Sequence, residues 1–431
     1  MLLNKIKEIK KEFPKDPVRY LELIFLNLML LSLPSFEAPK NIFLILFLLT
    51  SLYRQHSKKS KDPLSLWDWV FLSYIASAFL SAIFAGISPG DEWKGFKGIF
   101  LWIIIGWLIS RANYSRKTLS FIFILTLIAT IPPLLWGGIQ YLILHTKPDL
   151  QLHSVGQVNH SAIYLCINLG CAFGLMLSLW KKVDSGKVLL LAGMTSLFFT
   201  GIVIGQSRAA LALGYILITT LALILPNSRL IKHFLVSLVM SSLLCIFLFN
   251  APVVQKHFKS LEADSLILKG NEKYLGERFF VWNVSFEAMR FYPLFGIGNG
   301  NWHLIKISDI QKAVEIRGDR FDQEKYMLKV GHSHSLYLSA VTERGLFGLF
   351  ALLMLGVLWL ETLIKTFRNM MSDSLGGRYF WAGSFSAWIT TFCIGFVNST
   401  FHHEHAILAM ILLGIHLSYL KTQGNRKTSF Q

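Results

Sequence analysis

Apolar residues occur along most of this chain in long runs that short polar or charged segments separate. A helix needs about 20 apolar residues to cross a membrane, because the hydrocarbon core is roughly 30 Å thick and each residue adds about 1.5 Å. Twelve runs approach this length, and we predict that each is a transmembrane helix: Leu21–Phe36, Asn41–Tyr53, Leu66–Ile87, Phe96–Ile109, Leu119–Ile143, Ser161–Trp180, Val188–Ile204, Ala209–Leu225, Phe234–Phe249, Ser335–Ile364, Tyr379–Val397 and Ala406–Leu420. The pattern predicts an all-α integral membrane protein.

The basic residues alternate between the two sides of this predicted bundle. Short loops on the cytoplasmic side of a membrane collect Lys and Arg. With the N-terminus placed inside, the inner segments hold 24 Lys and Arg, whereas the short outer loops hold only Lys40, Lys94, Lys97, Lys147 and Arg208. The alternation persists to the C-terminus, which predicts an even number of helices and two cytoplasmic termini. The basic N-terminal stretch resembles a signal peptide, but no small-x-small cleavage site follows it, so we expect it to lead into the first helix.

Composition supports the same class of protein. Residues from the set AVILMFWYC make up 53% of the chain and charged residues 16%, whereas a soluble domain carries about 25% charged residues. The net charge of +17 does not require nucleic acid, because the basic excess lies where anionic inner-leaflet lipid would face it. The four cysteines all fall in predicted helices, where we expect them to pack as small apolar residues.

One predicted loop is much longer than the others. Residues 251–333 contain twelve basic and ten acidic side chains and fall on the outer side. Apolar and aromatic residues at helical spacing predict an amphipathic helix over Glu277–Phe291, which Pro293 ends, and a second helix over Leu304–Val314. The chain therefore divides into helices one to nine in residues 1–250, an outer helical loop domain in 251–333, and the last three helices with a short tail in 334–431.

Several polar side chains fall on the outer face of this topology. Arg208 lies between the seventh and eighth helices, Arg278 opens the amphipathic helix and His334 stands at the head of the tenth helix. Each also has an ordinary interpretation: Arg208 as a lipid contact, Arg278 as a solvated loop charge and His334 as a polar helix cap. The other outer polar residues are Asn159 and His160 before the sixth helix, and His402, His403, Glu404 and His405 before the last helix.

Taken together, these side chains favour chemistry on a diphosphate. A guanidinium offers a planar fork of donors to phosphate oxygens, and Arg278 in a first helical turn would add free backbone N–H groups. A neutral imidazole such as that of His334 is well suited to removing a hydroxyl proton. The chain has no Walker A loop, kinase motifs or outer acidic pair, so we predict no cofactor and no metal. Adjacent histidines on a helix point in different directions, which argues against a metal site at His402, His403 and His405.

The motifs around these residues resemble those of a known protein family. The stretch "HSLYLSAVTERGLFG" (334–348) resembles the signature of the bacterial O-antigen ligase and polymerase family, in which a histidine is followed at set distances by a glutamate and two glycines. "PLFGIGNGNW" (293–302) is similar to the Pro-x-x-Gly-x-Gly element of the family. "SRAALAL" around Arg208, "ERFFVW" around Arg278 and "GQVNHSA" before the sixth helix resemble its remaining elements. The extra His332 in "GHSH" departs from the pattern, but the spacing to Glu343 favours His334.

The resemblance implies a metal-independent glycosyltransferase in the inner membrane of a Gram-negative bacterium, with its active site on the periplasmic side. The donor would be a glycan on undecaprenyl diphosphate, and the acceptor a sugar hydroxyl of lipid A-core. His334 would be the general base, Arg208 and Arg278 would bind the diphosphate, and the anomeric carbon would be inverted. Asn159, His160, Glu343 and His332 would orient groups or contact the acceptor.

Two alternatives remain at this stage. An O-antigen polymerase would use the same chemistry to extend the lipid-linked glycan, and a polysaccharide or lipid transporter would also need basic groups in a helical bundle. A transporter predicts internal repeats and ionisable residues at mid-helix, and the sequence offers mainly Glu343 and Arg344.

Overall fold

The computed structural model describes residues 16–57, 63–180, 183–225, 278–329, 331–372 and 377–428. Within these ranges the chain is helical, with no strand. Seven of the described helices are long and apolar enough to cross a membrane. These helices are α4 (Leu66–Ile83), α5 (Glu92–Arg111), α6 (Arg116–Leu142), α7 (Val158–Leu179), α8 (Ser185–Ile204), α15 (Leu336–Ser372) and α17 (His403–Thr428).

Four further helices fall where the hydrophobic pattern predicts them: α2 (Pro17–Ser32), α3 (Glu37–His56), α9 (Arg208–Ile224) and α16 (Gly377–Ile394). The predicted helix over Phe234–Phe249 lies outside the described residues. Eleven of the twelve predicted runs therefore coincide with a helix, while the total of twelve spans remains a prediction.

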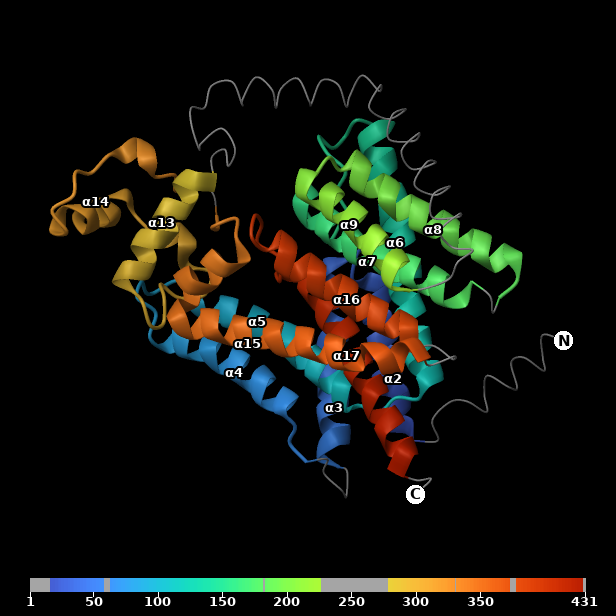
Figure 1. Ribbon diagram of the computed structural model, residues 1–431. Coiled ribbons are helices and arrows are strands. Elements are labelled where there is room, and N and C mark those ends of the chain that lie inside the picture. Colours follow the sequence, from blue (N-terminus) through green and yellow to red (C-terminus); the bar gives the residue numbers. More distant parts are fainter. Residues whose placement is uncertain are drawn as a thin grey trace.

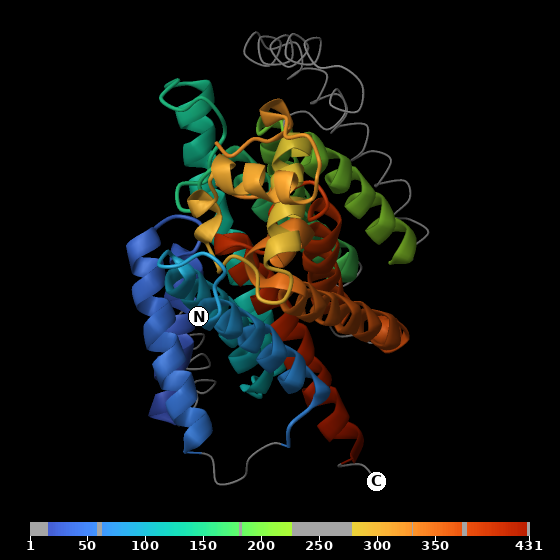
Figure 2. The same ribbon diagram turned by 90° about the vertical axis from the view of Figure 1, so that its left-hand side faces the viewer.

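Two described α-helices lie in the segment predicted to form the outer loop domain. α13 covers Arg278–Phe291, close to the predicted amphipathic helix, and α14 covers Ile307–Ile316. The predicted start of the second helix at Leu304 is wrong, because Asn301–Leu304 form a separate 3-10 turn. α13 packs against α14 and α15. The helices α13 and α14 lie to one side of the bundle in Figure 1 and face the viewer in Figure 2.

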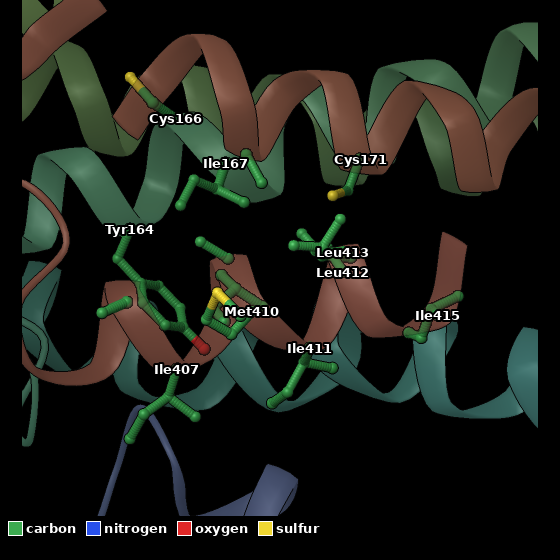
Figure 3. Close-up of a cluster of buried hydrophobic side chains, with 14 of the residues drawn as sticks. Tyr164, Cys166, Ile167, Cys171, Ile407, Met410, Ile411, Leu412, Leu413 and Ile415 are labelled. Carbon is green, nitrogen blue, oxygen red and sulfur yellow. The ribbon is translucent and has the colours of Figure 1, made fainter. Parts of the chain in front are cut away.

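Two helices form the centre of the bundle. α7 packs against α8, α9, α16 and α17, and α17 also packs against α5. α7 approaches α16 closely because Gly170 and Gly174 leave room: a Cβ on Gly170 would lie 2.1 Å from Ser386 Oγ, and one on Gly174 would lie 2.4 Å from Ala382 Cβ. Small residues at such contacts are typical of membrane helices. Figure 3 shows the apolar side chains of α7 and α17 between these helices.

The cysteines only partly follow the prediction. Cys166 and Cys171 are free and buried in α7, as expected of packing residues. Cys393 in α16 is also free but exposed, so it is not a core packing residue. Cys245 lies outside the described residues.

One end of the bundle holds buried ion pairs that sequence analysis did not find. The Glu22 carboxylate accepts from Arg54 and from the hydroxyl of Tyr114, and Asp68 accepts from both Arg111 and Trp107. Charges inside a helical bundle are costly unless partners satisfy them. Two of the basic residues that mark topology in the sequence, Arg54 and Arg111, therefore also hold helix ends together.

α15 is not one continuous helix. Gly345 has φ 64° and ψ −162°, so the helix breaks after Arg344. The segment after Pro293 fills the break: Ile297 N–H donates to Thr342 O at 2.9 Å, and Gly298 N–H donates to Glu343 O at 3.1 Å. The carbonyl groups released by the break thus find partners in a neighbouring loop. This loop therefore fixes the end of α15 that contains Glu343 and follows His334.

Candidate active site

Several helix ends meet at the end of the bundle opposite the buried ion pairs. Lys40 near the start of α3 forms a buried ion pair with Glu404 in the first turn of α17. Ser154 Oγ, in the loop before α7, donates to the same carboxylate at 3.3 Å. The backbone of Gly86, after α4, donates to Gly296 O at 3.0 Å. All of these ends fall on the side that the basic-residue pattern predicts to be outer.

His334 lies in a tight turn two residues before α15 begins. Its backbone is left-handed, with φ 52°, a conformation that is uncommon for a non-glycine residue but more accessible to histidine than to most others. The turn is held from both sides: Ser333 Oγ donates to Ser335 O at 2.8 Å, and Leu336 N–H donates to Gly395 O at 2.7 Å. His334 is thus a rigidly placed turn residue, whereas its sequence position indicated a helix cap.

The imidazole of His334 lies in a positively charged setting. Burial, followed by the charges of His332, Arg278 and His160, lowers its pKa to about 4. The ring centroids of His332 and His334 are 4.3 Å apart. The imidazole is therefore neutral, and able to accept a proton, throughout the neutral pH range.

Arg278 lies within electrostatic range of His334 and of the other predicted arginine, Arg208. Arg278 is half-buried in the first turn of α13, and burial followed by the nearby charge of Arg208 lowers the pKa of its guanidinium. Arg208 is exposed at the first residue of α9. The like charges of these two guanidinium groups act on each other, an arrangement that an anion such as a phosphate would relieve. The fold therefore places Arg278 within electrostatic range of Arg208 and of His334, two residues that are remote from it in sequence.

His160 is buried in the first turn of α7 and is surrounded by other histidines. Its ring centroid lies 6.4 Å from His332, 5.7 Å from His402 and 5.3 Å from His405. The sequence indicated each of these residues separately, but it gave no sign that the start of α7 contacts the start of α17. Asn159, the residue before His160, is half-buried in the same turn.

A cavity of about 440 Å³ adjoins this histidine cluster. Its lining includes Lys40, His332, Glu343, Arg344, His402 and His403. His334, Arg208 and Arg278 are outside the lining, but the ring of His332, which does line the cavity, lies 4.3 Å from that of His334 between centroids. The cavity contains charged groups of both signs and is suited to a polar ligand.

Glu343 and Arg344 lie directly before the break in α15. The Glu343 carboxylate interacts with the Arg344 charge and with the backbone N–H of Gly300. Arg344 Nη2 donates to the Tyr74 hydroxyl at 3.0 Å, and its guanidinium carbon lies 4.6 Å from the Tyr74 ring centroid. Its Nη1 is buried without a hydrogen-bond partner among the described residues. Both residues lie in the helical turn directly before the break and line the cavity, which gives the Glu343 carboxylate the polar setting that a charge inside a helical bundle requires.

Comparison with known proteins adds an independent finding. Residues 193–353 match a family model described as O-Antigen ligase, which supports assigning the chain to the O-antigen ligase and polymerase family. The matched region contains Arg208, Arg278, His334 and Glu343, but not His160 or the histidines before α17. No curated protein matches the chain. Together with the seven apolar helices, the match indicates a multi-pass membrane protein.

Proposed function

We propose that this chain is an O-antigen ligase, an inverting and metal-independent glycosyltransferase of the bacterial inner membrane. The donor is a glycan on undecaprenyl diphosphate, and the acceptor is a sugar hydroxyl of lipid A-core. One observation carries this proposal: within the region that matches the family, the imidazole of His334 lies within electrostatic range of Arg278, and Arg278 lies within electrostatic range of Arg208.

His334 is the general base in this proposal. It removes the proton of the acceptor hydroxyl as that oxygen attacks the anomeric carbon of the donor. The bond from the anomeric carbon to the diphosphate oxygen breaks, and its electron pair leaves with the diphosphate. Because the attacking and leaving oxygens lie on opposite faces of the sugar, the configuration inverts. The proton acquired by His334 passes afterwards to water or to the departing diphosphate.

Arg208 and Arg278 hold the diphosphate and offset the charge that grows on it as the bond breaks. Their positions also explain how the base is tuned. Without donor, burial and then the charges of His332 and Arg278 keep the pKa of His334 at about 4. A bound diphosphate neutralises that cation, so the pKa of His334 rises and the imidazole becomes a stronger base in the complex that needs it.

The remaining polar residues fit supporting roles. The cavity lined by Glu343 and Arg344 is suited to hydroxyls and anionic groups of the acceptor, and His332, which also lines it, neighbours His334. His160 and Asn159 approach from the start of α7 and orient this region. We place the site on the periplasmic side, with both termini cytoplasmic, because the short loops of the opposite side carry most of the Lys and Arg.

A reconstituted assay tests the proposal. Purified protein is given lipid-linked glycan with lipid A-core, and in a parallel reaction lipid-linked glycan alone. A ligase modifies lipid A-core in the first reaction and leaves the second unchanged. Longer lipid-linked glycan in the second reaction would instead identify an O-antigen polymerase, and movement of intact lipid-linked glycan without a new bond would identify a transporter.

A further inference from the structure

Three histidines form a compact set that the glycosyl-transfer proposal does not use as base or diphosphate ligands. One ring nitrogen each of His160, His402 and His403 lies within 4.8 Å of the others. His160 comes from the first turn of α7, whereas His402 and His403 precede and begin α17. The set therefore joins two helices that are far apart in sequence.

The local backbone explains why adjacent histidines face the same way. On a regular helix the side chains of neighbouring residues diverge by about 100°. Here Phe401 and His403 both have left-handed backbone, with φ 63° and 47°, and His402 lies before the helix begins. The chain turns sharply at this point, and the ring centroids of His402 and His403 are 3.6 Å apart. The sequence argument against a metal site assumed a helix where the structure has a turn.

Hydrogen bonding leaves this set available for a ligand. The Nε2 atom of His405 accepts from the backbone N–H of His402 at 3.3 Å. The Nδ1 atoms of both His402 and His405 are buried and have no hydrogen-bond partner among the described residues. An unpaired buried polar atom is costly, and a bound cation would remove that cost.

We propose that His160, His402 and His403 bind one divalent transition-metal ion of the zinc class and thereby tie the start of α7 to the start of α17. Neutral imidazole nitrogen is a preferred donor for such ions, at about 2.0–2.1 Å. The nitrogens are near enough for small ring rotations to reach that geometry. The ring of His332, with its centroid 6.4 Å from that of His160, or a water in the cavity completes four-coordination.

The surrounding charges are compatible with a cation. The charge of Lys40 acts on His403 more strongly than that of the Glu37 carboxylate does, but Lys40 is itself paired with Glu404. The site is therefore a structural tie, and it does not depend on the identity of the transferred glycan.

Cobalt titration of the full-length protein tests this inference. Protein in detergent micelles, with any affinity tag removed, is stripped with chelator and titrated with Co²⁺, whose visible absorption reports nitrogen-rich tetrahedral coordination. We expect one Co²⁺ per chain, displaceable by Zn²⁺, and a higher melting temperature of the metal-bound protein. Absence of stoichiometric Co²⁺ uptake by the wild-type protein overturns the proposal.

Matched variants locate the site. His403→Asn keeps a residue that tolerates left-handed backbone but removes a ligand, and we expect Co²⁺ affinity to fall at least tenfold; His402→Gln removes a second ligand. His153→Gln, at an exposed histidine in the loop before α7, should bind Co²⁺ as the wild type does. Equal affinity in His403→Asn and His153→Gln contradicts the assignment. His403 is exposed, so its variant remains informative even if His402→Gln fails to fold.

Discussion

Gly345 meets the backbone of Leu294 so closely that a Cβ on Gly345 would lie 2.2 Å from the Leu294 carbonyl carbon. This contact joins the motif in the loop after Pro293 to the motif in the broken helix α15. Gly296 makes the reciprocal approach, since its Cβ would lie 2.4 Å from the Glu343 carbonyl carbon. The glycines that appear as separate signatures in the sequence are thus the two halves of one backbone junction, which positions the end of α15 that follows His334.

Gly345→Ala should therefore destabilise the protein severely. Its positive φ alone costs a side chain about 1–3 kcal/mol, and the clash with Leu294 adds to that cost. Thermal unfolding of the purified protein measures the effect. Gly193→Ala is the matched control, because a Cβ at this position in α8 meets nothing within 4 Å. A Gly345→Ala protein as stable as Gly193→Ala would show that the junction does not constrain the fold.

His334→Ala should lower the rate of glycan transfer by about 10²–10⁴-fold, the range typical of losing a general base. The amount of protein in the membrane should stay near that of the wild type. His332→Ala provides the comparison, since His332 lies 4.3 Å from His334 between ring centroids and should cost less. A larger loss for His332→Ala than for His334→Ala would exchange their roles.

Arg278→Ala should abolish transfer, and Arg278→Lys should recover only part of it. A lysine restores the charge but not the planar fork that pairs with two phosphate oxygens. Steady-state kinetics over a range of lipid-linked donor concentrations measures the loss in kcat/KM. Arg290→Ala, at a half-exposed arginine later in α13 that pairs with Glu287, serves as a control for charge on the same helix. A fully active Arg278→Lys variant would rule out bidentate phosphate binding by this residue.

The pH profile of transfer should reflect the lowered pKa of His334. A base with a pKa of about 4 in the free protein is already unprotonated at pH 6, so kcat/KM should stay nearly constant from pH 8 to about 5.5 and fall as the pH drops towards 4. An unperturbed histidine would instead lose half of its activity near pH 6.5. An inflection of kcat/KM at that ordinary value would show that the imidazole is neither buried nor close to the arginine charge in the free protein.

Chelation should separate the two proposals. EDTA should leave the rate of transfer per folded molecule unchanged, because the proposed step uses an imidazole and two guanidinium groups. The same treatment should lower the melting temperature if a metal ties α7 to α17. Parallel activity and thermal-unfolding measurements before and after EDTA, with Zn²⁺ added back, distinguish these effects. Loss of transfer that Zn²⁺ restores at constant stability would give the metal a part in the reaction.

Hydrophobic patterning by itself located eleven of the described helices, because a membrane helix needs a long apolar run whatever its neighbours are. Motif spacing likewise selected Arg208, Arg278, His334 and Glu343. Only the tertiary structure decided that His160 meets His402 and His403, since contacts between helices depend on which faces pack and a single sequence does not encode that choice locally. The break at Gly345 was hidden for a related reason: the residues around it continue the apolar pattern of α15, and the loop that supplies their missing hydrogen bonds lies about 50 residues earlier in the chain.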